Sequence, residues 1–251
     1  MRSETLTYEA DGCEMRGRLY GGDGAAEKRP GILVFPEAFG LGEHAMGRAE
    51  RLAELGYVAL ACDLHGGGAV HENLESVKRL FGALMAEPAR IRARAKGGLD
   101  ALLSRPEVDP DRVAAIGYCF GGTMSLELAR APDPIAVAVG FHCGLASHNK
   151  DPGARIACPV LVCIGADDPG IDAAQRQAFE EEMRRSGADW QMHLYGGVVH
   201  SFTNPDADAR GTPQFSRYDA RADARSWRAM IELFDEIFEG PSKMESRPGP
   251  Q

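Results

Sequence analysis

A cysteine stands between two glycines in the segment Gly117-Tyr118-Cys119-Phe120-Gly121. The apolar run at 113–116 before it predicts a buried strand, and the residues from Thr123 onward predict a helix. A turn this sharp between a strand and a helix strains its apex residue, and side chains at the flanking glycines would clash with neighbouring backbone. Such a turn typically presents a nucleophile to a cleft. We therefore predict that Cys119 is a nucleophile, with a buried structural cysteine in a glycine turn as the alternative.

The helix that follows Cys119 would add chemistry of its own. A helix N-terminus carries a partial positive charge and unpaired N–H groups, and both favour the thiolate form of a cysteine. The backbone N–H of Phe120, next in the chain, can also bind the oxyanion that forms when a nucleophile attacks a carbonyl. The segment is therefore suited to acyl transfer.

Two later strand ends supply the groups that would activate this thiol. The segment VLVCIGADD ends in Asp167 and Asp168, and HLYGGVVHSF contains His200. A histidine base needs a carboxylate on its other ring nitrogen, which fixes its tautomer and stabilises the imidazolium. We choose Asp168, three residues after Gly165, and expect Asp167 to face solvent or the start of the next helix. The order nucleophile, acid, histidine is typical of strand-end triads.

These residues need a scaffold that brings strand ends together. Two strands are predicted around the hairpin turn Asp11-Gly12. Six further strands are predicted from apolar runs at 31–36, 57–64, 112–118, 135–142, 158–166 and 190–197. Because helical patterns separate these runs, they predict a mainly parallel sheet of about eight strands with helices on both faces, an α/β fold. The strand ends carry the candidate polar residues Glu37, Asp63, His65, Cys119, His142, Asp168 and His200.

Composition narrows the class of protein. The chain has 251 residues, 44% of them hydrophobic, which predicts a single domain over residues 1–240 and a polar tail at 241–251. The net charge of −9 argues against nucleic acid and anionic membranes as partners. No apolar run approaches membrane-spanning length and the N-terminus has no apolar signal segment, so we expect a soluble, cytoplasmic protein. The six cysteines form no CxxC pair and the histidines have no metal-ligand spacing, so we expect reduced thiols, no metal and no cofactor.

Four motifs, PEAFGL, GYCFGG, GADD and HSFTNP, occur in this order along the chain. With them the sequence resembles the dienelactone hydrolase family of α/β-hydrolases, also called carboxymethylenebutenolidases, from about Leu6 to Phe238. The resemblance implies an α/β-hydrolase fold and hydrolysis of an ester or lactone without a cofactor. A cysteine in the GYCFGG motif is quite specific, because most hydrolases of this fold carry serine there.

The resemblance also implies roles for the loop after the third strand. In the family, the glutamate at the position of Glu37 hydrogen-bonds the resting neutral thiol and takes its proton when substrate displaces it. A thiol held neutral is protected from oxidation. The N–H of Ala38 would be the second oxyanion donor. A loop carboxylate exposed to solvent is the alternative for Glu37.

One departure from the family concerns the substrate. Members that act on dienelactone bind its carboxylate with arginines, one of them four residues after the catalytic histidine, where this chain has Asn204. No second arginine can be aligned between Gly66 and Arg94. We therefore expect a neutral aryl ester or lactone. Four residues are expected to bind the substrate, namely Asn204, Phe39, His142 and Tyr118, and a satisfied polar residue is the alternative for His142.

Other functions stay open at this point. The chain is a candidate for true dienelactone hydrolysis, for promiscuous phosphotriester hydrolysis at the same site, and for small-molecule binding without catalysis. A thiol redox protein would need a resolving cysteine, for which Cys143 is a remote candidate. The expected partner is a small-molecule ester or lactone, and the expected assembly is a monomer or homodimer. A long helical stretch that breaks near Pro88 could act as a lid.

Overall fold

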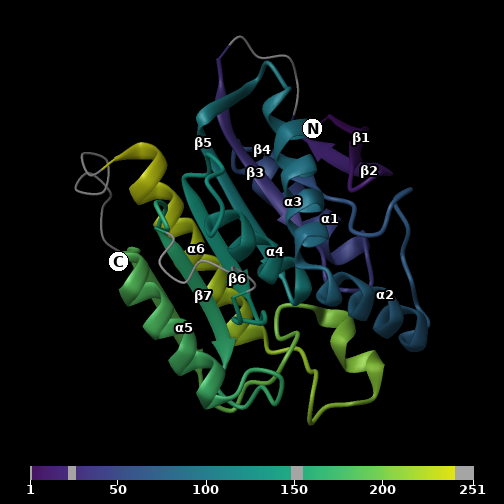
Figure 1. Cartoon of the computed structure of the whole chain (residues 1–251), viewed down its shortest axis with the longest axis vertical. Helices are drawn as coiled ribbons and strands as arrows, with labels where there is room; N and C mark the ends of the chain where they lie inside the picture. The colour runs from purple at the N-terminus through teal and green to yellow at the C-terminus, as the bar shows by residue number, and fades with distance from the viewer. Residues whose placement is uncertain (1, 22–26, 148–154, 241–251) are drawn as a thin grey trace.

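The computed structural model describes residues 2–21, 27–147 and 155–240, which share one eight-stranded sheet in the order β1-β2-β4-β3-β5-β6-β7-β8 (Figure 1). The pairs β1·β2 and β2·β4 are antiparallel and all others are parallel. The strands are β1 (Ser3–Ala10), β2 (Cys13–Tyr20), β3 (Arg29–Phe35), β4 (Val58–Ala61), β5 (Val108–Tyr118), β6 (Val137–Phe141), β7 (Val160–Gly165) and β8 (Trp190–Tyr195). The predicted number and mainly parallel arrangement of the strands are confirmed.

The first two strands form the hairpin that the sequence predicted. Asp11 and Gly12 both have positive φ, 54° and 69°, as a tight two-residue hairpin turn requires. The register pairs Ala10 with Cys13 directly across this turn.

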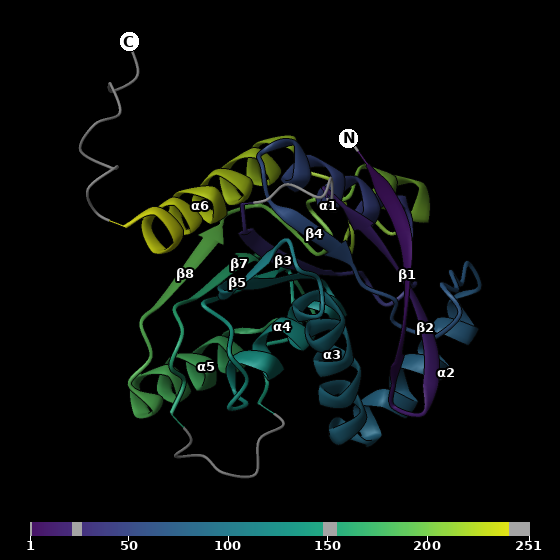
Figure 2. The same ribbon diagram turned by 90° about the horizontal axis from the view of Figure 1, so that it is seen from above.

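Helices cover both faces of the sheet. Figure 2 shows α1 and α6 on one side and α3, α4 and α5 on the other. The helices are α1 (Glu43–Glu54), α2 (Leu74–Ala86), α3 (Pro88–Leu103), α4 (Phe120–Ala129), α5 (Ala173–Ser186) and α6 (Ala220–Glu239). The predicted break near Pro88 is confirmed, because Pro88 is the first residue of α3, where its missing N–H costs no helical hydrogen bond.

The core divides into two clusters, one on each face of the sheet. In β3, Leu33 packs in one cluster, whereas its neighbours Ile32 and Val34 pack in the other. Successive side chains of a strand point to opposite faces, so a strand buried on both faces must be apolar throughout. This is why the central strands are continuous apolar runs in the sequence. Packing on both faces holds the sheet in place, and with it the strand ends that carry the candidate site residues.

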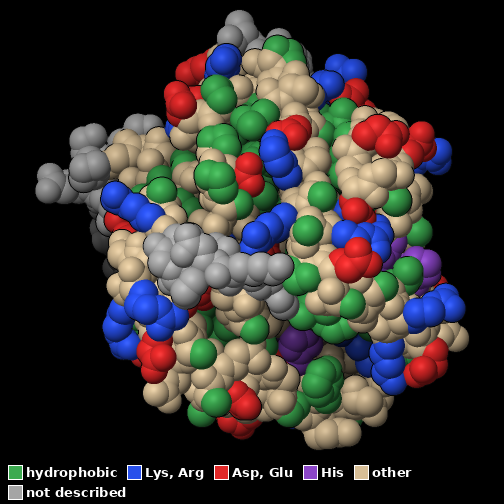
Figure 3. All heavy atoms as spheres, in the orientation of Figure 1, with side chains coloured by type: hydrophobic (Ala, Val, Ile, Leu, Met, Phe, Trp, Pro, Cys, Tyr) green, Lys and Arg blue, Asp and Glu red, His purple; other side chains and the backbone are tan. Residues whose placement is uncertain are grey.

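The sequence also predicted the absence of a membrane span, a scattered distribution of charge and a polar tail. Within the described ranges, no helix is long and apolar enough to cross a membrane. Acidic and basic side chains are interspersed on the face shown in Figure 3. The predicted polar tail, residues 241–251, lies outside the described residues. The single-domain boundary, the cytoplasmic location and the monomeric or dimeric state stay predictions.

Candidate active site

The strand–turn–helix around Cys119 has the geometry that its glycines predicted. Strand β5 ends at Tyr118, α4 begins at Phe120, and Cys119 between them has φ 54° and ψ −120°. A Cβ atom at Gly117 would overlap the backbone of Gly121. Neither glycine tolerates a side chain, since a Cβ at Gly121 would in turn overlap the backbone at the end of β3. The strained apex turns the cysteine out of the sheet at the carboxyl end of β5.

Asp168 and His200 are brought together from the ends of β7 and β8. The Oδ2 atom of Asp168 lies 2.7 Å from Nδ1 of His200. The other oxygen, Oδ1, accepts from the N–H of Gly170 at 2.8 Å, which holds the carboxylate in place. Asp168 is buried, whereas Asp167 is exposed. Of the two adjacent carboxylates, it is Asp168 that contacts the histidine.

His200 also lies next to the Cys119 thiol. Burial by itself would lower the pKa of His200, but the adjacent Cys119 and the hydrogen bond to Asp168 raise it to about 10. Hydrogen bonds and negative charge that face an imidazole favour its protonated form. The arrangement therefore favours the protonated form of the His200 imidazole.

Two backbone N–H groups, those of Phe120 and Ala38, are the predicted oxyanion donors. Phe120 is the first residue of α4, so its N–H has no acceptor within the helix. Ala38 lies in the loop after β3, and its carbonyl oxygen accepts from Nε2 of His65 at 2.8 Å. The oxyanion roles of both N–H groups stay proposals.

Glu37 has partners other than the thiol. Its Oε1 accepts from Ser201 Oγ at 2.6 Å, and its Oε2 accepts from Asn204 Nδ2 at 2.6 Å and from Arg210 Nη2 at 2.5 Å. The sequence-based expectation that Glu37 hydrogen-bonds the resting thiol of Cys119 is not met in this conformation. A guanidinium offers a charge-assisted hydrogen bond that is far stronger than one from a thiol.

The charge of Glu37 follows from these partners. The side chain is buried, which excludes the solvent-loop alternative. Burial by itself would raise its pKa, but the positive charge of Arg210 holds the pKa well below its usual range. Glu37 is therefore an ionised carboxylate inside the protein.

Arg210 is the residue that sequence reasoning missed. It lies at the end of the short helix η1 (Pro205–Arg210), which Asn204 caps by accepting from the N–H of Asp206. The family pattern marks the position four residues after His200, and Arg210 lies six residues further along the chain. No sequence signal marked position 210, because the contact with Glu37 spans 173 residues.

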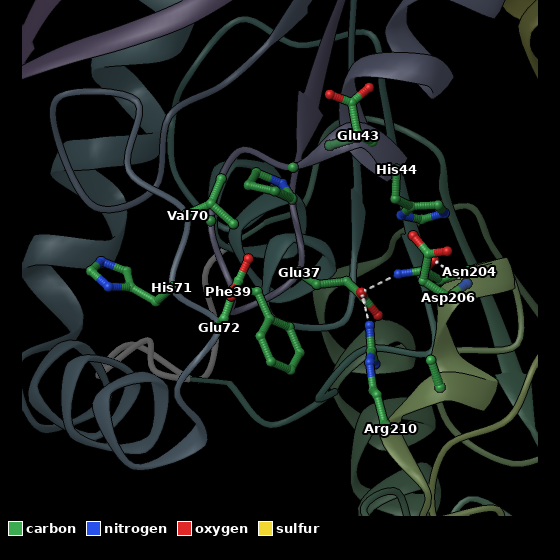
Figure 4. A pocket seen from close by; sticks show the side chains of 15 residues that line it. Glu37, Phe39, Glu43, His44, Val70, His71, Glu72, Asn204, Asp206 and Arg210 are labelled. Carbon is green, nitrogen blue, oxygen red and sulfur yellow. Dashed lines mark hydrogen bonds and ion pairs between the residues drawn. The ribbon is translucent and has the colours of Figure 1, made fainter.

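The described residues form a cavity of about 670 Å³ beside Glu37 (Figure 4). Figure 4 shows Glu37 pointing toward Asn204 and Arg210, and the guanidinium of Arg210 lies 4.7 Å from the centre of the Phe39 ring. Glu37 is among the lining residues of this cavity, whereas Cys119 and His200 are not. Its lining comprises Pro36, Glu37, Phe39, Gly40, Gly42, Glu43, His44, Ala45, Val70, His71, Glu72, Asn204, Asp206, Ala209 and Arg210.

The four predicted substrate-binding residues divide into two pairs. Phe39 and Asn204 line the cavity, although the side chain of Asn204 is engaged by Glu37. Tyr118 and His142 do not: their exposed fractions are 1% and 0%. Tyr118 stacks on a core phenylalanine, and His142 has hydrogen-bond partners on both ring nitrogens. Substrate contact by these two stays a prediction, and their burial argues against it. A strand-end position does not by itself fix the direction of a side chain.

No group of three His, Cys, Asp or Glu side chains in the part of the chain that the structure describes is arranged to hold a metal ion. The residues that converge at the strand ends are a thiol, an imidazole and carboxylates. They are suited to nucleophilic and acid–base chemistry.

Comparison with known proteins places the chain in a family. The model of the dienelactone hydrolase family matches residues 15–238, and the chain belongs to this family. A "Putative carboxymethylenebutenolidase" of Synechocystis sp. is 25% identical over 224 residues, 84% of this chain and 87% of the relative. A "Probable 2-oxo-3-(5-oxofuran-2-ylidene)propanoate lactonase" of Bradyrhizobium sp. is 28% identical over 190 residues, 72% of this chain and 76% of the relative.

Solved structures agree in fold. A dienelactone hydrolase-like promiscuous phosphotriesterase from metagenomic libraries superposes with a TM-score of 0.89 at 44% identity, over 94% of this chain and 98% of that one. A dienelactone hydrolase from Klebsiella pneumoniae, described as putative, shares the fold with a TM-score of 0.74 at 23% identity, over 94% of this chain and 98% of that one. The predicted α/β-hydrolase fold is confirmed, and the chain is a hydrolase of the ester- and lactone-cleaving class.

Proposed function

We propose that this chain hydrolyses carboxylic esters or lactones with Cys119 as the nucleophile and a thioester as the acyl-enzyme. The observation that carries the proposal is the 2.7 Å contact between Asp168 and His200, beside the thiol at the turn. A thiol, an imidazole and a carboxylate lie next to one another at one edge of the sheet, which is the set of groups that acyl transfer by a cysteine needs.

The steps follow from the contacts. The thiol proton passes to His200, and the sulfur attacks the carbonyl carbon while the N–H groups of Phe120 and Ala38 bind the oxyanion. Each donor contributes about 3 kcal/mol in comparable sites. The imidazolium returns its proton to the leaving alkoxide as the ester bond breaks. His200 then takes a proton from water, whose oxygen attacks the thioester and releases the acid, and the sulfur leaves as thiolate.

The role of Glu37 in this scheme depends on Arg210. The resemblance to the family implied that Glu37 receives the thiol proton. For that to happen here, its carboxylate must first leave the guanidinium of Arg210, which lies 2.5 Å away. Because the thiol already has His200 as its partner, we assign the first proton transfer to His200.

A neutral substrate fits the charges of the cavity. Arg210 is the basic residue of the lining, and Glu37 already compensates its charge. Three further acidic residues line the same cavity, namely Glu43, Glu72 and Asp206. This excess of negative charge would repel an anionic lactone. We therefore keep the neutral aryl ester or lactone as the proposed substrate class.

Arg210 is also the observation that favours the alternative, an anionic lactone such as dienelactone. The absence of a family arginine at position 204 was the reason to exclude an anionic substrate, yet an arginine from position 210 reaches the same cavity. Relatives named as a carboxymethylenebutenolidase and as a lactonase point the same way.

A phosphotriester is the third candidate substrate. The structural neighbour that is 44% identical is described as a promiscuous phosphotriesterase. Attack of a thiolate on phosphorus also builds negative charge on an oxygen, which the two backbone donors could bind.

The test is kcat/KM for a neutral aryl ester, an anionic dienelactone and a neutral phosphotriester, measured side by side. Cys119→Ala serves as the blank and His200→Ala as the second catalytic variant. We expect the neutral ester to be preferred and both variants to lose turnover. A preference for dienelactone would transfer the proposal to the anionic lactone. Turnover that survives in Cys119→Ala would contradict the cysteine mechanism.

Trapping the intermediate tests the thioester directly. Under rapid quench with an aryl ester, intact-protein mass spectrometry should show one added acyl group on the wild type and none on Cys119→Ala. No turnover of any ester, together with no acyl adduct, would favour the non-catalytic binding protein.

A further inference from the structure

A fully buried histidine lies directly behind the turn that carries the nucleophile. His142 follows β6, and its φ of 40° turns its side chain into the protein instead of into the cleft. The backbone N–H of Cys119 donates to Nδ1 of His142 at 3.1 Å. The same N–H also reaches the carbonyl oxygen of Phe141 at 3.0 Å, so it is shared between two acceptors.

These contacts determine the tautomer of His142. A backbone N–H can only donate, so Nδ1 carries a lone pair, and in the neutral ring the hydrogen is on Nε2. Nε2 lies 2.9 Å from Oγ1 of Thr203, to which it donates. Thr203 follows His200 by three residues, so one loop carries both the catalytic histidine and the acceptor that anchors His142.

Thr203 is itself held from the far side. Its carbonyl oxygen accepts from Nε2 of His44 at 3.1 Å and from Arg48 at 2.6 Å. Arg48 is anchored in turn by Asp223 at 2.8 Å. A chain of hydrogen bonds therefore runs from α6 through α1 to the backbone of Cys119.

Burial and the groups around His142 together favour its neutral form. Burial lowers its pKa first, and the neighbouring His200, His44 and Arg210 lower it further, against the opposing charge of Glu37. The result is a pKa well below the ordinary value. A proton on Nδ1 would remove the acceptor for the Cys119 N–H and would place a positive charge against His200, whose ring centre is 5.2 Å away.

We propose that His142 is a positioning residue for the nucleophile: its Nδ1 lone pair, fixed by the Nε2–H bond to Thr203, holds the strained Cys119 so that its sulfur faces His200. The proposal rests on the proposed cysteine mechanism. The bond to Phe141 would keep the turn folded without His142, but the direction of the turn would be less restricted. A misplacement of about 1 Å at a reacting atom can cost about 100-fold in rate.

A matched pair of variants tests this. His142→Leu fills a similar volume without an acceptor, whereas in His142→Asn the Oδ1 atom can stand close to the place of Nδ1 and accept the same bond. We expect His142→Leu to lower kcat by roughly 10- to 100-fold with little change in KM, and His142→Asn to recover most of the loss. Equal losses in both variants, or wild-type kcat in both, would overturn the proposal.

A second readout needs no ester. The pH profile of Cys119 alkylation by iodoacetamide, with Cys119→Ala as the blank, reports the thiolate–imidazolium pair. We expect the apparent thiol pKa to rise in His142→Leu and to stay close to wild type in His142→Asn. If the wild type hydrolyses no ester, the proposed function fails, yet this comparison still decides whether His142 positions the sulfur.

Two measurements do not depend on the folding of His142→Leu. Thr203→Val keeps the shape of the side chain and removes the acceptor for Nε2–H, so we expect a smaller loss of kcat in the same direction. In the wild type, ¹⁵N NMR of the imidazoles should show His142 with hydrogen on Nε2 and without titration between pH 5 and 8. A His142 that titrates in this range, or that carries its hydrogen on Nδ1, would rule the proposal out.

Discussion

Two histidine rings that meet at 5.2 Å, His200 and His142, have opposite pKa shifts. Burial lowers the pKa of both rings, so depth does not explain the difference. His200 faces the Asp168 carboxylate and the Cys119 sulfur, which favour a bound proton. His142 faces a backbone N–H on one nitrogen and a hydroxyl on the other, which favour the neutral ring. Because burial acts on both rings in the same direction, the partners of each imidazole account for the difference between their pKa shifts.

His44 belongs with His142 in this comparison. Burial lowers its pKa to about 4, and its Nε2 donates to the carbonyl oxygen of Thr203. We call His142 and His44 the neutral pair. In the proposed mechanism His200 changes its charge, whereas the neutral pair contacts the backbone of Cys119 and of Thr203.

The largest expected effect on activity comes from removing the carboxylate partner of His200, which would leave this ring neutral like His142 and His44. Asp168→Asn removes the carboxylate from Nδ1, so we expect the pKa of His200 to fall and kcat for an aryl ester to drop roughly 10³- to 10⁴-fold. Steady-state kinetics and the pH profile of Cys119 alkylation check both changes. Asp167→Asn is the matched control, because its carboxylate is adjacent in sequence but exposed. Equal losses in the two variants would contradict the assignment of Asp168.

The neutral pair should make stability depend on pH. Between pH 6.5 and about 4, the unfolded chain binds a proton at His44 that the folded protein excludes, so the free energy of unfolding falls as pH falls. The contribution of His44 is at most about 3 kcal/mol. Urea unfolding of wild type and His44→Gln at pH 7, 5.5 and 4.5 measures it. We expect a flatter dependence in His44→Gln, and identical slopes would show that His44 is protonated in the folded state.

His200 should act on stability with the opposite sign. Because its pKa is raised to about 10 in the folded protein, its contribution is fully present below pH 6.5 and is lost as pH rises toward 10. The same urea unfolding series, extended above pH 7, measures this loss. We expect the contribution of His200 to the free energy of unfolding to fall as pH rises, whereas that of His44 falls as pH falls.

A smaller effect, on substrate preference, is expected from a substitution at Glu37. Its negative charge also raises the pKa of both members of the neutral pair. Glu37→Gln leaves Arg210 uncompensated in the cavity. We expect kcat/KM for an anionic lactone to rise about 5- to 10-fold relative to a neutral ester. In the matched control Glu43→Gln, an exposed residue of the same lining, salt screens the change and the ratio should move less than about 2-fold. If the two variants change this ratio equally, Arg210 does not take part in substrate selection.

The smallest effect is expected at Tyr118, whose ring lies 4.6 Å from the ring centre of His44. Its buried hydroxyl has no hydrogen-bond partner among the described residues. Tyr118→Phe keeps the ring contact and removes the unsatisfied oxygen, so we expect unchanged kcat/KM and a stability gain of up to about 1 kcal/mol. Thermal unfolding and ester kinetics check this, and a change in KM would support Tyr118 as a substrate-binding residue.

Local sequence patterns predicted the nucleophile turn well. The glycines on either side of Cys119 permit one backbone path, because any Cβ at those positions would meet backbone atoms. Apolar runs located the strands for a similar reason, since a strand covered on both faces must be apolar at every position. Asp168 and His200 were found because their strands end where the parallel sheet gathers its polar residues.

The cavity could not be predicted in the same way. Arg210 reaches Glu37 from the short helix η1, and nothing in the spacing between the two residues marks the contact. The inward turn of His142 depends on a positive φ that a histidine rarely adopts. Tertiary packing decides the direction of a side chain at a strand end. Sequence patterns of two or four residues carry no information about that packing.

The sequence by itself determined the fold class, the positions of the strands along the chain and the sharp turn around Cys119, because these follow from glycine sterics and from apolar periodicity over a few residues. Only the tertiary structure decided which groups are charged. It paired Glu37 with Arg210, placed His142 under the turn and buried Tyr118. Each of these depends on contacts between residues far apart in the chain, and charge inside a protein is set by such contacts.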